Sequence, residues 1–184
     1  MNEKLPSSQA ALSLLSESGC SKRVIAHCKA VSALAVKFAR ACERKGAKVD
    51  VNLVEVGALL HDIGRSKTHS VNHAVIGVEI AKSLNLPEPI ISIIECHIGG
   101  GIAADEAERL GLPVKDYVPV TLEEKLVTYA DKLIEKAKVV PLEKTITKFS
   151  RELGKDHPAI DRIIRLHEEL SPLIGDSNAD SHSS

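Results

Sequence analysis

The chain has 184 residues, of which 43% are hydrophobic, so it can bury the core of one domain but not comfortably of two. Its net charge of −1 lacks the basic surplus of dedicated nucleic-acid binders. Two Tyr, two Phe and no Trp are too few for a platform that stacks single-stranded bases. The four cysteines form no C-x-x-C pair, and no apolar run reaches the roughly 18 residues of a membrane span, so we expect a cytoplasmic protein without a membrane partner.

The first third of the chain predicts helices and no convincing strand. A short helix over 8–17 ends at Gly19, and a long one runs from the N-cap Ser21 to just before Gly46. The following helix, 51–60, is apolar nearly all round, which is typical of a buried central helix.

The rest of the chain continues the helical pattern, so the predicted fold class is all-α. Further helices are expected over 73–82, 89–97, 105–110, 142–153 and 158–171, together with one that begins at the capping box of Thr121 and Glu124. Residues 98–120 could form a loop over a site, with the glycines at 99–101 as a hinge or simply as a helix stop. We expect a single domain over 1–174 and a disordered tail over 175–184.

Several ionisable side chains fall at positions that helical periodicity turns inward. His61 and Asp62 end the apolar helix 51–60, and His97 ends another; His27 lies beside a buried stripe, and Asp131 is in phase with apolar neighbours. A buried carboxylate is costly unless it is paired or binds a metal. Histidine and carboxylate without a thiolate pair suit Fe, Mn, Co, Ni or Zn. A single histidine on an apolar face is more often a core residue, so these residues by themselves leave a metal site and a structural role open.

The order of these residues resembles the HD superfamily of metal-dependent phosphohydrolases. His61-Asp62-Ile63-Gly64 is the HDIG form of the family motif. The resemblance continues at Asn72-His73-Ala74, at Cys96-His97 and at the segment 126–132, which contains Asp131. It covers about residues 21–138 and is closest in pattern to small stand-alone HDIG proteins of the kind typical of archaea.

The resemblance implies a helical bundle with a metal site at its centre. It assigns His27, His61, Asp62 and Asp131 to a first metal, and it assigns His73 and His97 to a second metal, with Asp62 bridging the two. The implied cofactor is a pair of divalent transition metals, Fe or Mn, with Co, Ni and Zn as alternatives. The lysine that often follows the family motif is replaced here by Arg65, which keeps the positive charge.

The implied activity is a phosphohydrolase or phosphodiesterase that acts on a small nucleotide-like phosphoester or phosphoanhydride through a metal-bound hydroxide, with Asp62 as the catalytic residue. Arg65, Lys67 and Lys132 are the predicted substrate-binding residues. Cyclic phosphodiesters and dinucleoside polyphosphates compete as substrates, while the neutral charge disfavours long nucleic acid. The alternative is a non-catalytic HD-like module that binds a nucleotide or a protein partner. The oligomeric state is left open.

Overall fold

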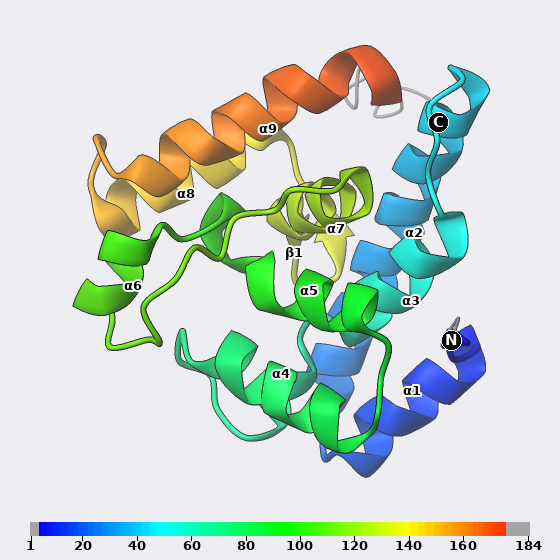
Figure 1. Cartoon of the computed structure of the whole chain (residues 1–184). Coiled ribbons are helices and arrows are strands. Elements are labelled where there is room, and N and C mark those ends of the chain that lie inside the picture. Colours follow the sequence, from blue (N-terminus) through cyan, green and yellow to red (C-terminus); the bar gives the residue numbers. More distant parts are fainter. Residues whose placement is uncertain (1–3, 176–184) are drawn as a thin grey trace.

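The computed structural model describes residues 4–175 and confirms the all-α fold class (Figure 1). Its α-helices are α1 Ser8–Glu17, α2 Lys22–Arg44, α3 Val51–Leu60, α4 His73–Ser83, α5 Glu88–Cys96, α6 Ala104–Arg109, α7 Leu122–Lys132, α8 Leu142–Leu153 and α9 Pro158–Ile174. Two short 3-10 helices follow α3 and α5, η1 at Ile63–Ser66 and η2 at Ile98–Gly100. Apart from Gly175, the predicted tail lies outside the described residues.

The helices begin where side chains satisfy the exposed N–H groups of a first turn. The Ser21 side chain accepts a hydrogen bond from the Val24 N–H, and Asp50 accepts one from Leu53. At the start of α7, the Thr121 hydroxyl accepts from the Glu124 N–H, and the Glu124 carboxylate accepts from the Thr121 N–H. This reciprocal pair is the predicted capping box.

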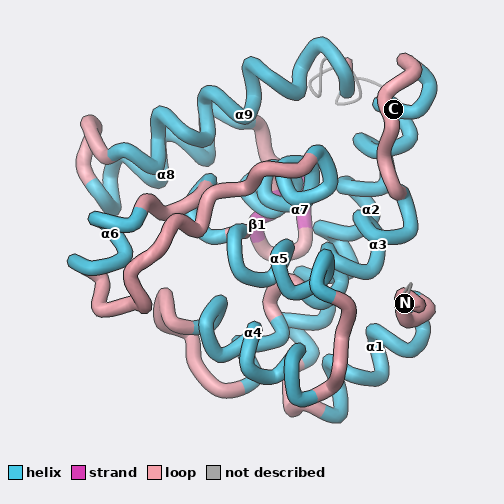
Figure 2. The backbone as a smooth tube through the Cα atoms, in the orientation of Figure 1, coloured by secondary structure: helices cyan, strands magenta, loops and turns pink. Residues whose placement is uncertain are grey.

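The expectation of no strand was wrong in one place. Ile134–Glu135 (β1) and Lys138–Val139 (β2) form a small antiparallel hairpin after α7 (Figure 2). Strands of two residues are too short to leave the alternating pattern by which strands are recognised in a sequence.

The helix α3 lies at the centre of the bundle, as its sequence predicted. It packs against α1, α2, α5 and α7, so nearly every face of it is covered (Figure 1). Val54 belongs to a core shared with α2, α7 and α9, while Leu60 belongs to a second core shared with α1, α4 and α5. Because α3 is held on all sides, the residues that end it are fixed in position. Among the helices of residues 4–175, none combines the length and apolar character that crossing a bilayer requires.

Two glycines bring η1 into direct contact with the start of α4. A Cβ atom added at Gly64 would lie 1.9 Å from the His73 carbonyl oxygen and 2.7 Å from the Gly77 nitrogen. At Gly77, an added Cβ would lie 2.8 Å from the Ile94 side chain. The glycine of the HDIG motif is therefore needed for packing, and it places His73 against the end of α3.

Residues 98–120 form a covering segment that is tied to α9. Glu106 of α6 and Arg162 of α9 form two parallel contacts, Nη1–Oε2 at 2.8 Å and Nη2–Oε1 at 2.9 Å. At the base of the segment, Gly100 has a φ of 79° and packs against Ile163. The first half of the covering segment is thus held against α9 by an ion pair and by close packing.

This ion pair predicts a stability difference that depends on pH. Burial opposes ionisation of Glu106, but hydrogen bonds from Arg162 and from the Ala103 N–H outweigh it and lower the pKa of Glu106. A lowered folded-state pKa adds stability above the unfolded value of about 4.3, and this stability is lost as pH falls through the folded value. We expect Glu106→Gln to reduce the free energy of unfolding by about 1–2 kcal/mol at pH 7 and by much less near pH 3.

Urea unfolding of the unmodified protein and of Glu106→Gln at pH 7, 5 and 3 measures the difference in their free energies of unfolding. Glu108→Gln is the matched control, because Glu108 is an exposed carboxylate on the same helix. If Glu106→Gln lowered the free energy of unfolding by the same amount at all three pH values, the ionised Glu106 would not be what stabilises this contact.

Candidate metal centre

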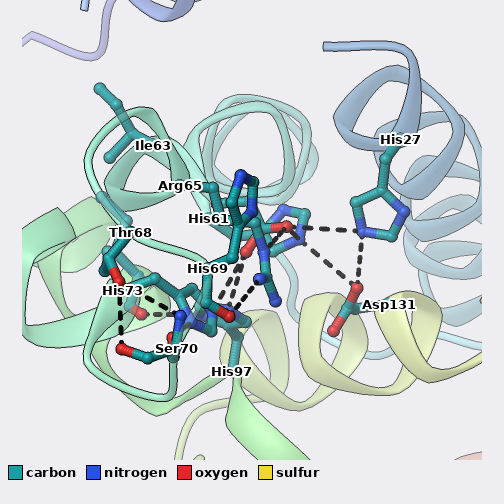
Figure 3. Close-up of polar contacts among 12 residues, drawn as sticks. His27, His61, Ile63, Arg65, Thr68, His69, Ser70, His73, His97 and Asp131 are labelled. Atoms are coloured by element: carbon teal, nitrogen blue, oxygen red, sulfur yellow. Dashed lines mark hydrogen bonds and ion pairs between the residues drawn. The ribbon is translucent and has the colours of Figure 1, made fainter. Parts of the chain in front are cut away.

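The six predicted ligands meet at one point in the bundle. His27 comes from α2, His61 and Asp62 follow α3, His73 begins α4, His97 follows α5, and Asp131 lies in the last turn of α7. Figure 3 shows His27 and Asp131 facing each other, with the other labelled histidines beside them. The His27 Nε2 lies 2.9 Å from Asp131 Oδ1, and the His61 Nε2 lies 3.5 Å from the same oxygen. Residues that are 104 positions apart in sequence are therefore in contact.

Asp62 stands between two pairs of histidines. Its Oδ1 lies 3.2 Å from His73 Nε2 and 3.4 Å from His97 Nε2. Its Oδ2 lies 3.7 Å from His61 Nε2 and 3.8 Å from His27 Nε2. Each carboxylate oxygen thus faces its own histidine pair, which is the arrangement that a carboxylate shared by two metal ions requires.

Backbone hydrogen bonds orient three of the histidines. Each has its Nδ1 2.7 Å from the carbonyl oxygen three residues earlier, in the pairs His61–Ala58, His73–Ser70 and His97–Ile94. A carbonyl oxygen only accepts, so each Nδ1 carries a proton, and the Nε2 of each ring faces the centre. The Nε2 atoms of His73 and His97 are only 3.0 Å apart. At this distance the two nitrogens share either a proton, in a hydrogen bond, or a metal ion that both of them bind.

The centre also holds buried polar atoms that fit a metal ion. His61 Nε2 and Asp62 Oδ1 are buried and have no hydrogen-bond partner in the described part of the chain, which is costly unless an ion satisfies them. Two groups of side chains offer ligand atoms within 4.8 Å of one another, His27 with His61 and Asp131, and His61 with Asp62 and His97. All of these atoms are imidazole nitrogens or carboxylate oxygens, which suit a divalent transition metal.

The electrostatics of the centre favour a bound cation. Burial opposes ionisation of Asp62, but His61, His73 and His97 outweigh it, and its pKa lies well below the usual range. Burial likewise opposes ionisation of Asp131, whose pKa is nevertheless well below the usual range because Lys132 and two histidines surround it. Burial lowers the pKa of His97 to about 4, so this ring is neutral at pH 7.

The pKa of His61 also indicates that positive charge is stabilised at the centre. Burial tends to lower its pKa, but Asp62 and Asp131 outweigh this effect and raise it. The two carboxylates therefore stabilise positive charge at the position that the His61 Nε2 faces, whether a proton or a metal ion supplies it.

Two of the three predicted substrate-binding cations lie at the centre. The Arg65 Nε donates to Asp62 Oδ2 at 2.7 Å, and the Lys132 Nζ donates to Asp131 Oδ2 at 2.5 Å. Both residues line the cavity that opens beside the centre. Lys67 is exposed and is not among the described residues that line this cavity, so its role in substrate binding stays a prediction.

The cavity beside the centre has a volume of about 580 Å³, within the range of pockets that bind small molecules. Part of the segment 98–120, which the sequence suggested as a loop over a site, lines this cavity through residues such as Ile102 and Arg109. Sequence reasoning missed the contributions of α8, of α9 and of the residue before α9, which include Phe149, Leu153, His157 and Arg162. The available signal was the apolar spacing of Ile146, Phe149 and Leu153 on α8, which reads equally as an ordinary core-facing stripe.

The sequence of this bundle matches a known family. Residues 24–136 match the family model of the HD domain. This match covers more than half of the chain, so the chain belongs to the HD-domain family.

Relatives differ in length and in name. The chain is 51% identical over 164 residues to an uncharacterized protein of Methanocaldococcus jannaschii, covering 89% of this chain and 96% of that protein. It is 40% identical over 173 residues to a tRNA (cytidine(56)-2'-O)-methyltransferase of Picrophilus torridus, covering 93% of this chain but 48% of that enzyme. The chain therefore spans about half the length of that relative.

A solved structure shares the fold. The HD domain of the phosphodiesterase PgpH of L. monocytogenes, solved in complex with cyclic-di-AMP, superposes with a TM-score of 0.56 and 21% sequence identity. The alignment covers 95% of this chain and 98% of that domain. At 21% sequence identity, this similarity shows that the two proteins share a fold, and it shows no more than that.

Proposed function

We propose that this protein is a metal-dependent phosphohydrolase that acts on a small nucleotide-like phosphoester or phosphoanhydride. The observation that carries the proposal is the position of Asp62, whose two oxygens each face a separate pair of histidine Nε2 atoms. The HD-domain family match supports the class of reaction, and the cavity beside the centre provides space for a small substrate.

The residues that would hold metal fall into two overlapping sets. His27, His61, Asp62 and Asp131 would hold one ion, while His73 and His97 would hold a second ion together with Asp62. A bound divalent metal lowers the pKa of water and polarises a phosphate oxygen. Iron or manganese is the expected metal, with cobalt, nickel and zinc as alternatives.

The charged side chains at the centre favour binding of an anion once a metal is present. Asp62 and Asp131 are balanced by Arg65 and Lys132, so any divalent metal makes the centre positive overall. A phosphate group complements that charge. Arg65 and Lys132 line the cavity, where they can bind phosphate oxygens and stabilise the charge that develops on them during hydrolysis.

The first test is the metal content per chain of protein purified without oxygen, followed by hydrolysis assays with cyclic phosphates and dinucleoside polyphosphates. Two equivalents of metal with hydrolysis would support the proposal. One equivalent would limit the metal ligands to His27, His61, Asp62 and Asp131. No metal, even after metal is supplied, would favour the non-catalytic binding module.

A histidine variant separates the two metal positions. We expect His97→Gln to reduce the metal content from two equivalents to one, because this ring serves only the Oδ1 side of Asp62. The matched control is His167→Gln, which alters a histidine that hydrogen bonds to Tyr129 outside the ligand set. Metal analysis of both variants gives the answer, and equal metal content in the two would show that His97 is not a ligand.

A further inference from the structure

The aromatic side chains of this chain are distributed unevenly. The sequence holds two Phe, two Tyr and no Trp, and all four rings lie in the described residues. Phe38, Tyr117 and Tyr129 are buried. Phe149 is half-buried, and it lines the cavity beside the metal centre.

The position of Phe149 is fixed relative to the centre. The Thr145 hydroxyl, on the same helix α8, donates to the carbonyl oxygen of Lys132 at 2.6 Å. Thr145 is the one buried side chain among the described residues of α8, so this contact anchors the helix to the end of α7. Phe149 follows one helical turn later, and Asp131 and Lys132 line the same cavity.

The wall around Phe149 is apolar and incompletely covered. Leu153 on α8 is 47% exposed and Leu110, just after α6, is 48% exposed, and both line the cavity. Ile98 and Ile102 line it as well. The lining of the cavity therefore combines cationic side chains, Arg65 and Lys132 beside the metal centre and also Arg109 and Arg162, with apolar side chains that include one ring. A nucleotide likewise combines a charged phosphate with a flat base.

We propose that Phe149 binds the base of the substrate, with Leu110 and Leu153 beside it, while Arg65 and Lys132 bind the phosphate. This inference rests on the proposed function and narrows its substrate class to compounds that carry a base. One ring among aliphatic side chains stacks one base, which agrees with the shortage of aromatic residues for binding a strand. Phe149 lies beyond residues 24–136, so the recognition element is outside the family-matched segment.

The test compares three ligands on the metal-loaded protein by isothermal titration calorimetry: AMP, ribose 5-phosphate and inorganic phosphate. AMP and ribose 5-phosphate differ only by the base. We expect AMP to bind about 10-fold more tightly than ribose 5-phosphate, as stacking on one aromatic ring provides. Phe149→Ala should bind AMP no more tightly than ribose 5-phosphate, and its affinity for ribose 5-phosphate should equal that of the unmodified protein.

Two further variants keep the result interpretable. Phe149→Leu retains apolar bulk without the ring, so it should lose most of the ratio while α8 remains folded by circular dichroism. Leu84→Ala removes an exposed apolar side chain that does not line the cavity, and it should keep the full ratio.

The outcomes separate this inference from the proposed function. Equal binding of AMP and ribose 5-phosphate to the unmodified protein, or an unchanged ratio in both Phe149 variants, would overturn the role of Phe149 and leave the phosphohydrolase proposal intact. Failure of all three ligands, inorganic phosphate included, to bind the metal-loaded protein would overturn both.

Discussion

Asp62→Ala should abolish metal retention and hydrolysis together. Asp62 faces all four surrounding histidine Nε2 atoms, so its loss removes the shared ligand of both proposed ions. Loss of a partner that merely orients a ligand costs about 10–100-fold in metal affinity or activity, and we expect a shared ligand to cost more than about 100-fold. Elemental analysis and a hydrolysis assay on the same preparation measure both effects.

Two comparisons sharpen this result. Asp62→Asn keeps the size of the side chain but removes its charge, so it should lose metal as well. Glu168→Gln removes an exposed carboxylate on α9 and should change neither metal content nor activity. Hydrolysis by metal-depleted Asp62→Ala at the original rate would refute the proposed function, since Asp62 is the carboxylate that lies between the two histidine pairs.

Gly64→Ala should destabilise the fold and displace His73 at the same time. The added Cβ would lie 1.9 Å from the His73 carbonyl oxygen, which is backbone and cannot rotate away. Overpacking of this kind typically costs about 1–3 kcal/mol, and the closeness of this contact places the expected cost near 3 kcal/mol or above. For a chain of this size, that cost lowers Tm by roughly 6–12 °C. Thermal unfolding gives the stability, and metal analysis reports the loss of the ion held by His73.

Gly19→Ala is the control for glycine substitution as such. Gly19 has a φ of 92° and no atom within 4 Å of an added Cβ, so the expected cost is only the backbone strain of about 1–2 kcal/mol. Its metal content should stay at the level of the unmodified protein. If Gly64→Ala retained full stability and full metal content, the contact between η1 and α4 would not be what positions His73.

The sequence by itself determined the helices and most of the centre. Apolar spacing, together with caps such as Ser21 and the Thr121–Glu124 box, defined where helices begin, because these signals act over one or two turns of the chain. The order of His27, His61-Asp62 and Asp131 indicated the HD family, which the match over residues 24–136 confirms. The hairpin formed by Ile134–Glu135 and Lys138–Val139 was not predicted, because its strands are too short to give a periodic signal.

Tertiary structure alone decided how these residues meet. The distribution of histidines between the two oxygens of Asp62, and the separation of Lys67 from Lys132, depend on how helices distant in sequence pack against each other. The position of Phe149 also depends on tertiary packing. Its apolar spacing on α8 is that of an ordinary core-facing helix. Only the structure shows that the buried Thr145 joins this helix to the end of α7. Local patterns show which face of a helix is buried. What that face contacts depends on the packing of the whole chain.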